Sequence, residues 1–156
     1  MRRLPRVVIT DFVADDLTPE RRILEGVADV EALDANREDE LNGRIEEADA
    51  LMVYHNIGLT AKTIDRLNRC KLIVRCGVGY DNVDRELAGR RGILVANVPD
   101  YGSEEVADTA MGMMLALTRG IALLNSRLRR EEGPWFYTQA VPCLRLRERV
   151  FGIVGL

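Results

Sequence analysis

The sequence predicts an α/β protein with a doubly wound parallel sheet, and three observations carry this prediction. Short apolar runs rich in Val, Ile and Leu recur through the first hundred residues. Signals for helix starts lie between these runs, which is the alternation expected of a parallel sheet covered by helices. Hydrophobic residues make up 47% of the 156-residue chain and charged residues 30%, a balance that can build a real core.

The apolar runs are candidate parallel strands, each expected to be buried on both faces. They cover residues 6–10, 30–33, 50–54, 71–76 and 93–98. Thr18 followed by Pro19 predicts an N-cap and a helix-starting proline. Thr60 predicts the cap of another helix, which carries Ile64 and Leu67 on one face. The loops at the carboxyl ends of the strands are where a doubly wound sheet binds its ligands.

A single long helix is expected from about Ser103 to Arg130, because acidic residues lie in its first turn and arginines in its last. It would be roughly 40 Å long at about 1.5 Å per residue. The stretch "AMGMMLAL" makes it apolar on nearly every side, so we expect it to pack against a second domain or subunit. The following residues, with Pro134, Pro142 and adjacent aromatic side chains, are expected to form an arm.

Composition narrows the classes of function. The formal net charge is −3 and basic residues are dispersed among acidic ones, so no surface for nucleic acid is expected. The longest uncharged apolar run, 109–118, is about half of the roughly 20 residues that span a membrane, and Asp11 interrupts any secretory signal. We therefore expect a cytoplasmic protein without a membrane segment. Three cysteines with a single histidine predict reduced thiols and no metal site.

The stretch "RCGVGYDNVD" leaves a predicted strand through Gly77 and Gly79. In one interpretation it is an ordinary junction between a strand and a helix, with Asp81, Asn82 and Asp84 as turn and cap residues. In the other, the glycines let backbone N–H groups converge into a nest for a carboxylate. It is not the dinucleotide fingerprint G-x-G-x-x-G, because Asn82 stands at the place of the third glycine. Spacing alone leaves both interpretations open.

Two further features lie at predicted strand ends. Asp11, Asp15 and Asp16 follow the first strand, where a phosphorylated receiver domain keeps its acidic pocket. The aspartate and lysine that such a domain needs after later strands are missing, so these acids are interpreted as solvated loop residues. His55, the only histidine, follows the third strand and could polarise a substrate near neutral pH, although a surface position is the plainer interpretation.

The chain ends on "VFGIVGL", residues 150–156, an apolar run that predicts a strand entering Gly155. With Gly152 three residues earlier, this run has the look of the start of a phosphate-binding turn at a helix N-terminus.

Three stretches, "LIVRCGVGYDNVD", "GRRGILVANVPDYGSEEVADTA" and "RVFGIVGL", together resemble the D-2-hydroxyacid dehydrogenase family. This family includes phosphoglycerate and glycerate dehydrogenases and the C-terminal-binding protein corepressors. The resemblance extends in order over the whole chain and is most specific from Leu72 to Ala110. It implies a flavodoxin-like substrate domain over residues 1–101, a long interdomain helix with a dimerisation arm over 102–149, and the first strand of a Rossmann domain over 150–156.

The resemblance also implies NAD-dependent hydride transfer between a D-2-hydroxy acid and a 2-oxo acid. NAD is the implied cofactor, with NADP left open, and the implied assembly is a homodimer. The family's catalytic arginine, glutamate and histidine match no residue here. His55 is therefore not given their role, and the chain alone is expected to be inactive.

Residue by residue, the resemblance implies two sets of contacts. The substrate-binding residues are Tyr54, His55, Asn56, Gly77, Val78 and Gly79. Among them the backbone of Val78 and Gly79 would hold the substrate carboxylate, which agrees with the nest interpretation. The cofactor-binding residues are Val78, Val106 and Gly155. Tyr54 and His55 stand where phosphoglycerate enzymes place an arginine, which argues against 3-phosphoglycerate as the substrate.

Two alternatives belong to other functional classes. The stretch "VYHNIGLT" is closer to the corepressor branch, so an NAD(H)-binding transcriptional corepressor that recognises short peptides is the main one. The other is a stand-alone flavodoxin-like regulator, against which the apolar helix and the apolar final strand argue.

Overall fold

The computed structural model describes residues 3–13, 16–140, 143 and 145–155. The chain divides into two compact units, Met1–Tyr101 and Gly102–Leu156. The division of the chain into a substrate domain, an arm and the start of a nucleotide-binding domain stays a prediction.

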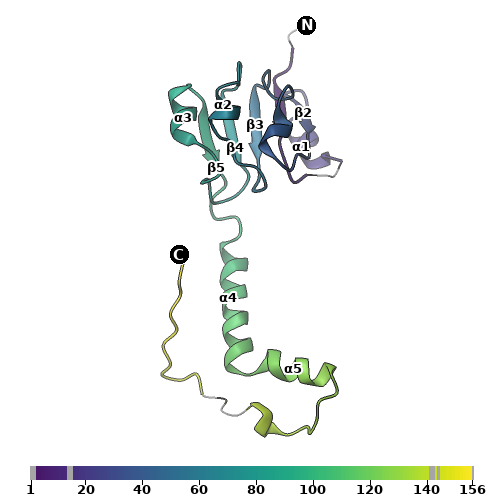
Figure 1. The fold of residues 1–156 in the computed structure, drawn as a ribbon, viewed down its shortest axis with the longest axis vertical. Coiled ribbons are helices and arrows are strands. Elements are labelled where there is room, and N and C mark those ends of the chain that lie inside the picture. Colours follow the sequence, from purple (N-terminus) through teal and green to yellow (C-terminus); the bar gives the residue numbers. More distant parts are fainter. Residues whose placement is uncertain (1–2, 14–15, 141–142, 144, 156) are drawn as a thin grey trace. The chain divides into compact units, whose positions relative to one another are not determined.

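The first unit holds a five-stranded parallel sheet in the order β2-β1-β3-β4-β5 (Figure 1). The strands are β1 (Arg6–Ile9), β2 (Asp29–Ala32), β3 (Ala50–Val53), β4 (Leu72–Arg75) and β5 (Leu94–Asn97). All of them overlap the apolar runs of the sequence. The order is the flavodoxin-like one, so the predicted α/β fold class is confirmed.

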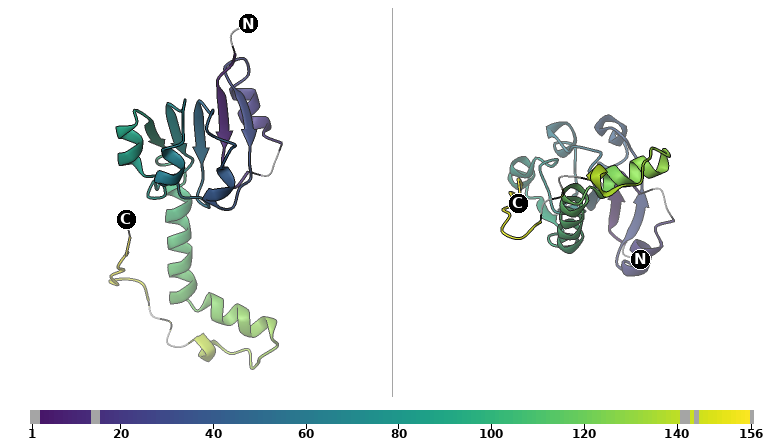
Figure 2. Two further views of the ribbon diagram at one scale, coloured as in Figure 1. Left: turned by 45° about the horizontal axis from the view of Figure 1, so that its top comes forward. Right: turned by 90° about the horizontal axis from the view of Figure 1, so that it is seen from below.

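Short helices connect the strands. They are α1 (Thr18–Ile23), η1 (Glu38–Leu41), α2 (Ala61–Ile64) and α3 (Arg85–Arg90). Because parallel crossovers are right-handed and the strand order reverses at β1, α1 covers one face of the sheet and the other three cover the opposite face (Figure 2).

The helix starts follow the sequence signals in part. Thr60 caps α2 as predicted, since its Oγ1 accepts a hydrogen bond from the N–H of Lys62 at 3.3 Å. The prediction for α1 is off by one position: the N-cap is Leu17, with a left-handed φ of 56°, and Thr18 is already helical. In place of a capping hydroxyl, the carboxylate of Asp16 accepts the N–H of Thr18 at 3.1 Å.

The main core lies on the face covered by η1, α2 and α3. One row of the sheet forms its floor, in register across four strands: Val8, Leu51, Ile73 and Val95. The helices contribute Leu41, Ile64 and Ala88, all fully buried. On the opposite face β1 is well covered, but Leu94 of β5 is 73% exposed. The expectation that each strand is buried on both faces is wrong for β5, an edge strand whose other face is covered by none of the described helices.

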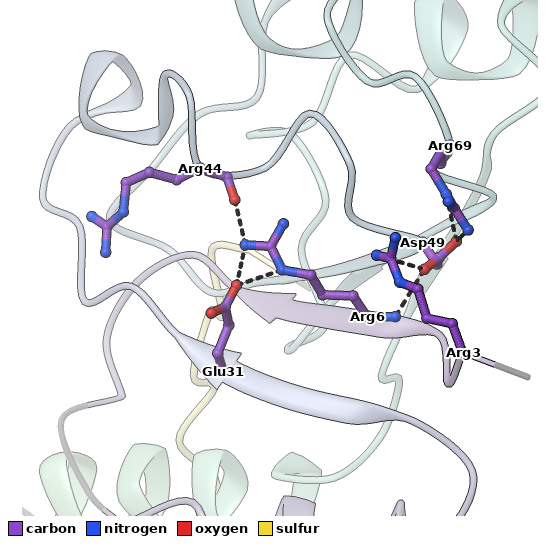
Figure 3. Close-up of polar contacts among 6 residues, drawn as sticks. All are labelled: Arg3, Arg6, Glu31, Arg44, Asp49 and Arg69. Carbon is purple, nitrogen blue, oxygen red and sulfur yellow. Dashed lines mark hydrogen bonds and ion pairs between the residues drawn. The ribbon is translucent and has the colours of Figure 1, made fainter. Parts of the chain in front are cut away.

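Polar contacts tie the strands together at the amino edge of the sheet (Figure 3). The Asp49 carboxylate accepts the backbone N–H of Arg6 at 2.8 Å and the guanidinium of Arg69 at 3.0 Å. These hydrogen bonds, that of Arg6 first, hold the pKa of Asp49 below its usual value. The side chain of Arg6 pairs with Glu31 and also donates to the carbonyl of Arg44 at 2.7 Å.

The second unit contains α4 (Ser103–Thr118), α5 (Ile121–Arg129) and η2 (Tyr137–Ala140). The prediction of one continuous helix is therefore wrong: α4 and α5 are bent by 69° across Arg119 and Gly120. Gly120 is the N-cap of α5 with a φ of 66°, a conformation that glycine adopts without steric cost. Within the described residues no single helix has the length and hydropathy of a membrane span, and α4 and α5 reach them only when counted together across the bend.

The predicted final strand is also absent: the described residues 150–155 have no regular structure. The backbone N–H and C=O groups of a strand form hydrogen bonds with a neighbouring strand, and none of the described residues pairs with this segment. Its apolar composition alone therefore does not make it a strand.

Candidate functional site

Loops that follow β1, β3, β4 and β5 meet at the carboxyl edge of the sheet. They cover residues 10–13, 54–59, 76–84 and 98–102, as far as the structure describes them. The parallel strands bring the loops to one edge, and side-chain hydrogen bonds then join one loop to the next. This edge contains all six predicted substrate residues. Asp15, one of the acids considered in the sequence, lies outside the described residues.

The side chain of Asp11 is central to this edge of the sheet. It is fully buried, and both carboxylate oxygens accept hydrogen bonds. Oδ1 accepts the Thr10 hydroxyl at 2.7 Å and the N–H of Tyr54 at 2.9 Å, while Oδ2 accepts the N–H of Asn56 at 2.8 Å. The interpretation of Asp11 as a solvated loop acid is wrong, because the residue fixes the backbone of the loop after β3.

Asn82 holds the same loop from the other side. Its Nδ2 donates to the carbonyl of Tyr54 at 2.9 Å and to that of Ile57 at 2.8 Å. Next to it, Leu59 and Val83 form an isolated parallel bridge. Asn82 therefore does more than the turn role expected of it, because it joins the loop after β4 to the loop after β3. The predicted cap role of Asp84 is confirmed by its bond from the N–H of Leu87 at 3.0 Å.

Hydrogen bonds to two of its carbonyl groups fix the Gly77–Gly79 segment. The N–H of Val98 donates to the carbonyl of Gly77 at 3.1 Å, and Asn97 Nδ2 donates to the carbonyl of Val78 at 2.8 Å. Within the described part of the chain, the N–H groups of Val78 and Gly79 have no acceptor. Neither glycine has a left-handed φ, so the segment differs from the alternating nest geometry. Two adjacent backbone donors nevertheless remain available to an anion.

The side chain of Arg75 lies close to Gly77. A Cβ at position 77 would lie 1.7 Å from Nη1 of Arg75, so the guanidinium, the far end of a flexible side chain, would have to shift to make room for it. Arg75 Nε is buried without a hydrogen-bond partner among the described atoms. The adjacent Cys76 is half-buried, and burial raises the pKa of its thiol. The site therefore holds a positive side chain beneath the loop and a protonated thiol next to it, and the sequence analysis assigned neither to the site.

His55 stands in an aromatic cluster. The Phe12 ring lies with its centroid 4.5 Å from that of His55 and 5.5 Å from that of Tyr54. Phe12 is 55% exposed and has a φ of 71°, which is uncommon for a residue with a bulky side chain. The His55 side chain is exposed, as its plainer interpretation expects. Its aromatic contact comes from the loop after β1, which is distant in the chain, so the sequence around His55 does not reveal it.

The predicted cofactor residues fall in both units. Val78 lies in the first unit and Val106 in the second, in the first turn of α4. Gly155 also lies in the second unit and has a φ of 92°, which favours glycine. No group of three metal-ligating side chains occurs among the residues that the structure describes.

Comparisons with known proteins agree with this architecture. The profile of the family described as D-isomer specific 2-hydroxyacid dehydrogenase, catalytic domain, matches residues 7–143. The D-3-phosphoglycerate dehydrogenase of Methanocaldococcus jannaschii is 35% identical over 151 residues. This match covers 97% of the chain and only 28% of the relative, so the chain spans less than a third of that protein.

Solved structures are similar over most of the chain. The NADPH-dependent glyoxylate/hydroxypyruvate reductase of Sinorhizobium meliloti, in complex with NADP and malonate, has a TM-score of 0.69 and 28% identity. The match covers 92% of this chain and 43% of that one. The NAD+-bound 3-phosphoglycerate dehydrogenase of Entamoeba histolytica has a TM-score of 0.65 and 28% identity, with 74% of this chain and 40% of that one covered.

Proposed function

We propose that this chain, which belongs to the D-isomer specific 2-hydroxyacid dehydrogenase family, is the substrate-binding part of an enzyme that interconverts a D-2-hydroxy acid and a 2-oxo acid. The observation that carries the proposal is the pair of adjacent N–H groups at Val78 and Gly79, which have no acceptor in the described chain. They lie at the carboxyl edge of a parallel sheet, where such folds bind ligands. The carboxylate of a 2-oxo acid is the matching acceptor.

The surroundings of these donors support binding of a small anionic acid. The positive charge of Arg75 lies under Gly77, and Asn97 holds the carbonyl of Val78 at 2.8 Å so that the peptide plane is fixed. Tyr54, His55 and Asn56 belong to the neighbouring loop, which Asn82 ties to this one. We propose that these three residues contact the variable part of the substrate. No lysine or arginine occurs at positions 54–59, and this supports a non-phosphorylated acid.

A nicotinamide cofactor, NAD or NADP, would supply or accept the hydride. The residues assigned to it fit such a group: Val78 and Val106 present apolar side chains that are 52% and 70% exposed, suited to the face of a ring. At Gly155 nothing lies within 4 Å of the place of a Cβ, so a pyrophosphate could approach the backbone closely. We propose Val78, Val106 and Gly155 as cofactor contacts, and binding assays with both dinucleotides would identify the preferred one.

The carboxylate site is tested by comparing two substitutions at Gly79 in a full-length protein that contains this chain. Gly79→Pro removes the N–H donor, and the Michaelis constant for the 2-oxo acid should rise by roughly tenfold or more. Gly79→Ala keeps the donor and adds only a contact with Asp81 Oδ1 at 3.3 Å, so its effect should stay within about threefold. Equal Michaelis constants for the proline variant and the wild type, with intact circular dichroism, would refute the assignment.

His55 is proposed as a specificity residue and not as the acid–base group. Replacing His55 by alanine should alter the ranking of 2-oxo acids without abolishing turnover. Complete loss of activity in a folded variant would show that the histidine takes part in the chemistry. The 156-residue chain alone is expected to show no turnover of a dinucleotide with any 2-oxo acid.

We also propose a homodimer that acts in the cytoplasm. Large apolar side chains of the second unit are exposed, among them Leu117 by 79% and Trp135 by 63%, which a second copy could cover. Free thiols at all three cysteines fit a reducing compartment. Light scattering that finds a monomer at micromolar concentration would contradict the dimer. The corepressor alternative has no specific support in these relatives.

A further inference from the structure

We propose that Asp11 and Phe12 form a positioning element for the loop at residues 54–57: Asp11 fixes the loop backbone, and Phe12 fixes the imidazole of His55. This element sets the direction from which His55 meets the variable part of a 2-oxo acid. Its effect on substrate choice rests on the proposed function, whereas the positioning of His55 does not depend on it.

The Asp11 half of the element rests on the pattern of loop hydrogen bonds. The N–H groups of Tyr54 and Asn56 both donate to the Asp11 carboxylate, at 2.9 and 2.8 Å. The N–H of His55 between them has no acceptor among the described residues. Two anchored amides on either side of a free one form a short arch, and His55 stands at its top. Because the anchoring carboxylate is fully buried, water does not compete for these bonds.

The Phe12 half rests on an exposed aromatic ring in an unfavourable backbone conformation. A φ of 71° is unfavourable for a residue with a Cβ, so the surrounding structure must hold it in place. Asp11 does so, since it precedes Phe12 directly and is locked by its own three bonds. The result is a ring whose plane is tilted by 54° to the imidazole at 4.5 Å, a favourable aromatic contact. Asp11 and Phe12 are adjacent in sequence. The end of β1 therefore positions both the backbone of the loop at residues 54–57 and the side chain of His55.

The same bonds also link neighbouring parts of the sheet, because β1 pairs with β3 and Tyr54 directly follows β3. Two of the three donors to Asp11 come from the loop that carries the predicted substrate residues, 43 and 45 positions away. Stabilisation of the sheet and positioning of this loop therefore rest on the same bonds, and the resonances of His55 report the positioning separately.

The imidazole itself provides the test, because His55 is the only histidine and its proton resonances need no assignment. In the wild-type chain the ring current of the nearby Phe12 should displace these resonances from the values of a free histidine. Phe12→Leu and Asp11→Asn should each move them towards the values of a free histidine. Asp65→Asn, which removes a carboxylate 3.6 Å from Arg91, and Phe136→Leu in the second unit are matched controls that should leave them unchanged.

Hydrogen exchange in the wild type tests the arch without any substitution. The amides of Tyr54 and Asn56 should exchange slowly and that of His55 rapidly, which keeps the proposal testable even when Asp11→Asn does not fold. Equal exchange at all three amides, or histidine resonances unaffected by both Phe12→Leu and Asp11→Asn, would overturn the proposal.

Substrate ranking then tests the functional consequence in a full-length protein. Wild type, Phe12→Leu and Asp65→Asn are compared on phenylpyruvate and pyruvate. The ratio of the two kcat/KM values should move towards one in Phe12→Leu by roughly tenfold, with kcat on the better substrate little changed, and should stay constant in Asp65→Asn. An unchanged ratio in Phe12→Leu would contradict the specificity role. Absence of turnover in the wild type would instead refute the proposed function, while the resonance and exchange results would still decide the positioning.

Discussion

The two units of the molecule contain similar proportions of apolar residues and use them in opposite ways. In Met1–Tyr101 the strand and helix residues close over a core in which Val8, Leu51 and Ile73 are fully buried. In Gly102–Leu156 none of the described side chains is buried. Large apolar side chains are among the exposed ones, since Met113 is 59% and Leu117 79% exposed. The first unit covers its main core with its own helices. The second has the composition of a core whose other half belongs to another surface.

Side-chain hydrogen bonds show the same contrast. In the first unit they join residues far apart in the chain, as between Asp11 and Tyr54, 43 positions away. In the second unit they stay local: the Thr109 hydroxyl donates to the carbonyl of Glu105, 4 positions away, and Arg127 reaches Gln139, 12 positions away. Tertiary contacts therefore decide the structure of the first unit, and local preferences dominate in the second.

The largest expected effect comes from matched truncations in the two units. Leu51→Ala removes a fully buried side chain from the core and should lower the free energy of unfolding by about 2–5 kcal/mol. Leu117→Ala makes the same chemical change at a position that is 79% exposed, and below the concentration at which the proposed dimer forms it should change the free energy of unfolding by less than about 0.5 kcal/mol. Urea unfolding of both variants measures the difference. Similar losses would mean that the second unit has a core of its own, formed in solution by association.

A smaller effect is expected at Asp49, which ties strands of the first unit together. Asp49→Asn should cost about 1–2 kcal/mol at pH 7, because a charged acceptor of the Arg6 N–H and the Arg69 guanidinium is lost. The folded-state pKa of Asp49 is lowered, so its contribution is complete above the ordinary aspartate pKa of about 3.9 and is lost as the pH falls through the lowered value. Denaturation curves of wild type and variant should therefore converge in acid. A gap that persists at pH 2 would exclude this ionic origin.

The smallest effect is expected at Gly120, where the second unit departs from its predicted helix. Alanine there disfavours the left-handed φ of 66° by about 1 kcal/mol and favours continuous helix by a similar amount. Gly120→Ala should thus raise the helical signal in circular dichroism by joining α4 to α5. Gly112→Ala, inside α4, is the matched control and should leave the bend in place. An unchanged signal in Gly120→Ala would show that packing, and not the glycine, holds the bend.

These contrasts explain what could be predicted from the sequence. The positions of the strands follow from short apolar runs between helix signals, so β1, β3 and β4 are found where they are expected. Their flavodoxin-like order was implied only by the family resemblance. The break at Gly120 appears in the sequence only as a glycine within an apolar pattern, and that pattern predicts a continuous helix. The composition of the final run predicts a strand, but pairing is a property of two segments, and residues 150–155 have no regular structure.

The candidate site was predictable to a lesser degree, and the reason is again the distance between partners along the chain. The glycines at 77 and 79 predict a tight loop. A histidine at the end of a predicted strand is a local signal for a candidate binding residue. The bonds from Asp11 to Tyr54 and Asn56 span 43 and 45 positions. Hydrophobic periodicity carries no information about contacts between residues so far apart in the chain. A cluster of three loop acids therefore gave the wrong interpretation of Asp11. A single aspartate directly after a buried strand, next to Thr10, is the signal that could have found it.

The amide of Asn82 has a consequence for engineering this family. This amide donates to the carbonyls of Tyr54 and Ile57 from a different loop, so residues 54–57 cannot be transferred between proteins without that loop. A graft that transfers this segment alone from a relative would arrive without its own anchor on the following loop. Libraries that aim at new substrates should vary the two loops as one block, with Asp11 and Asn82 kept constant.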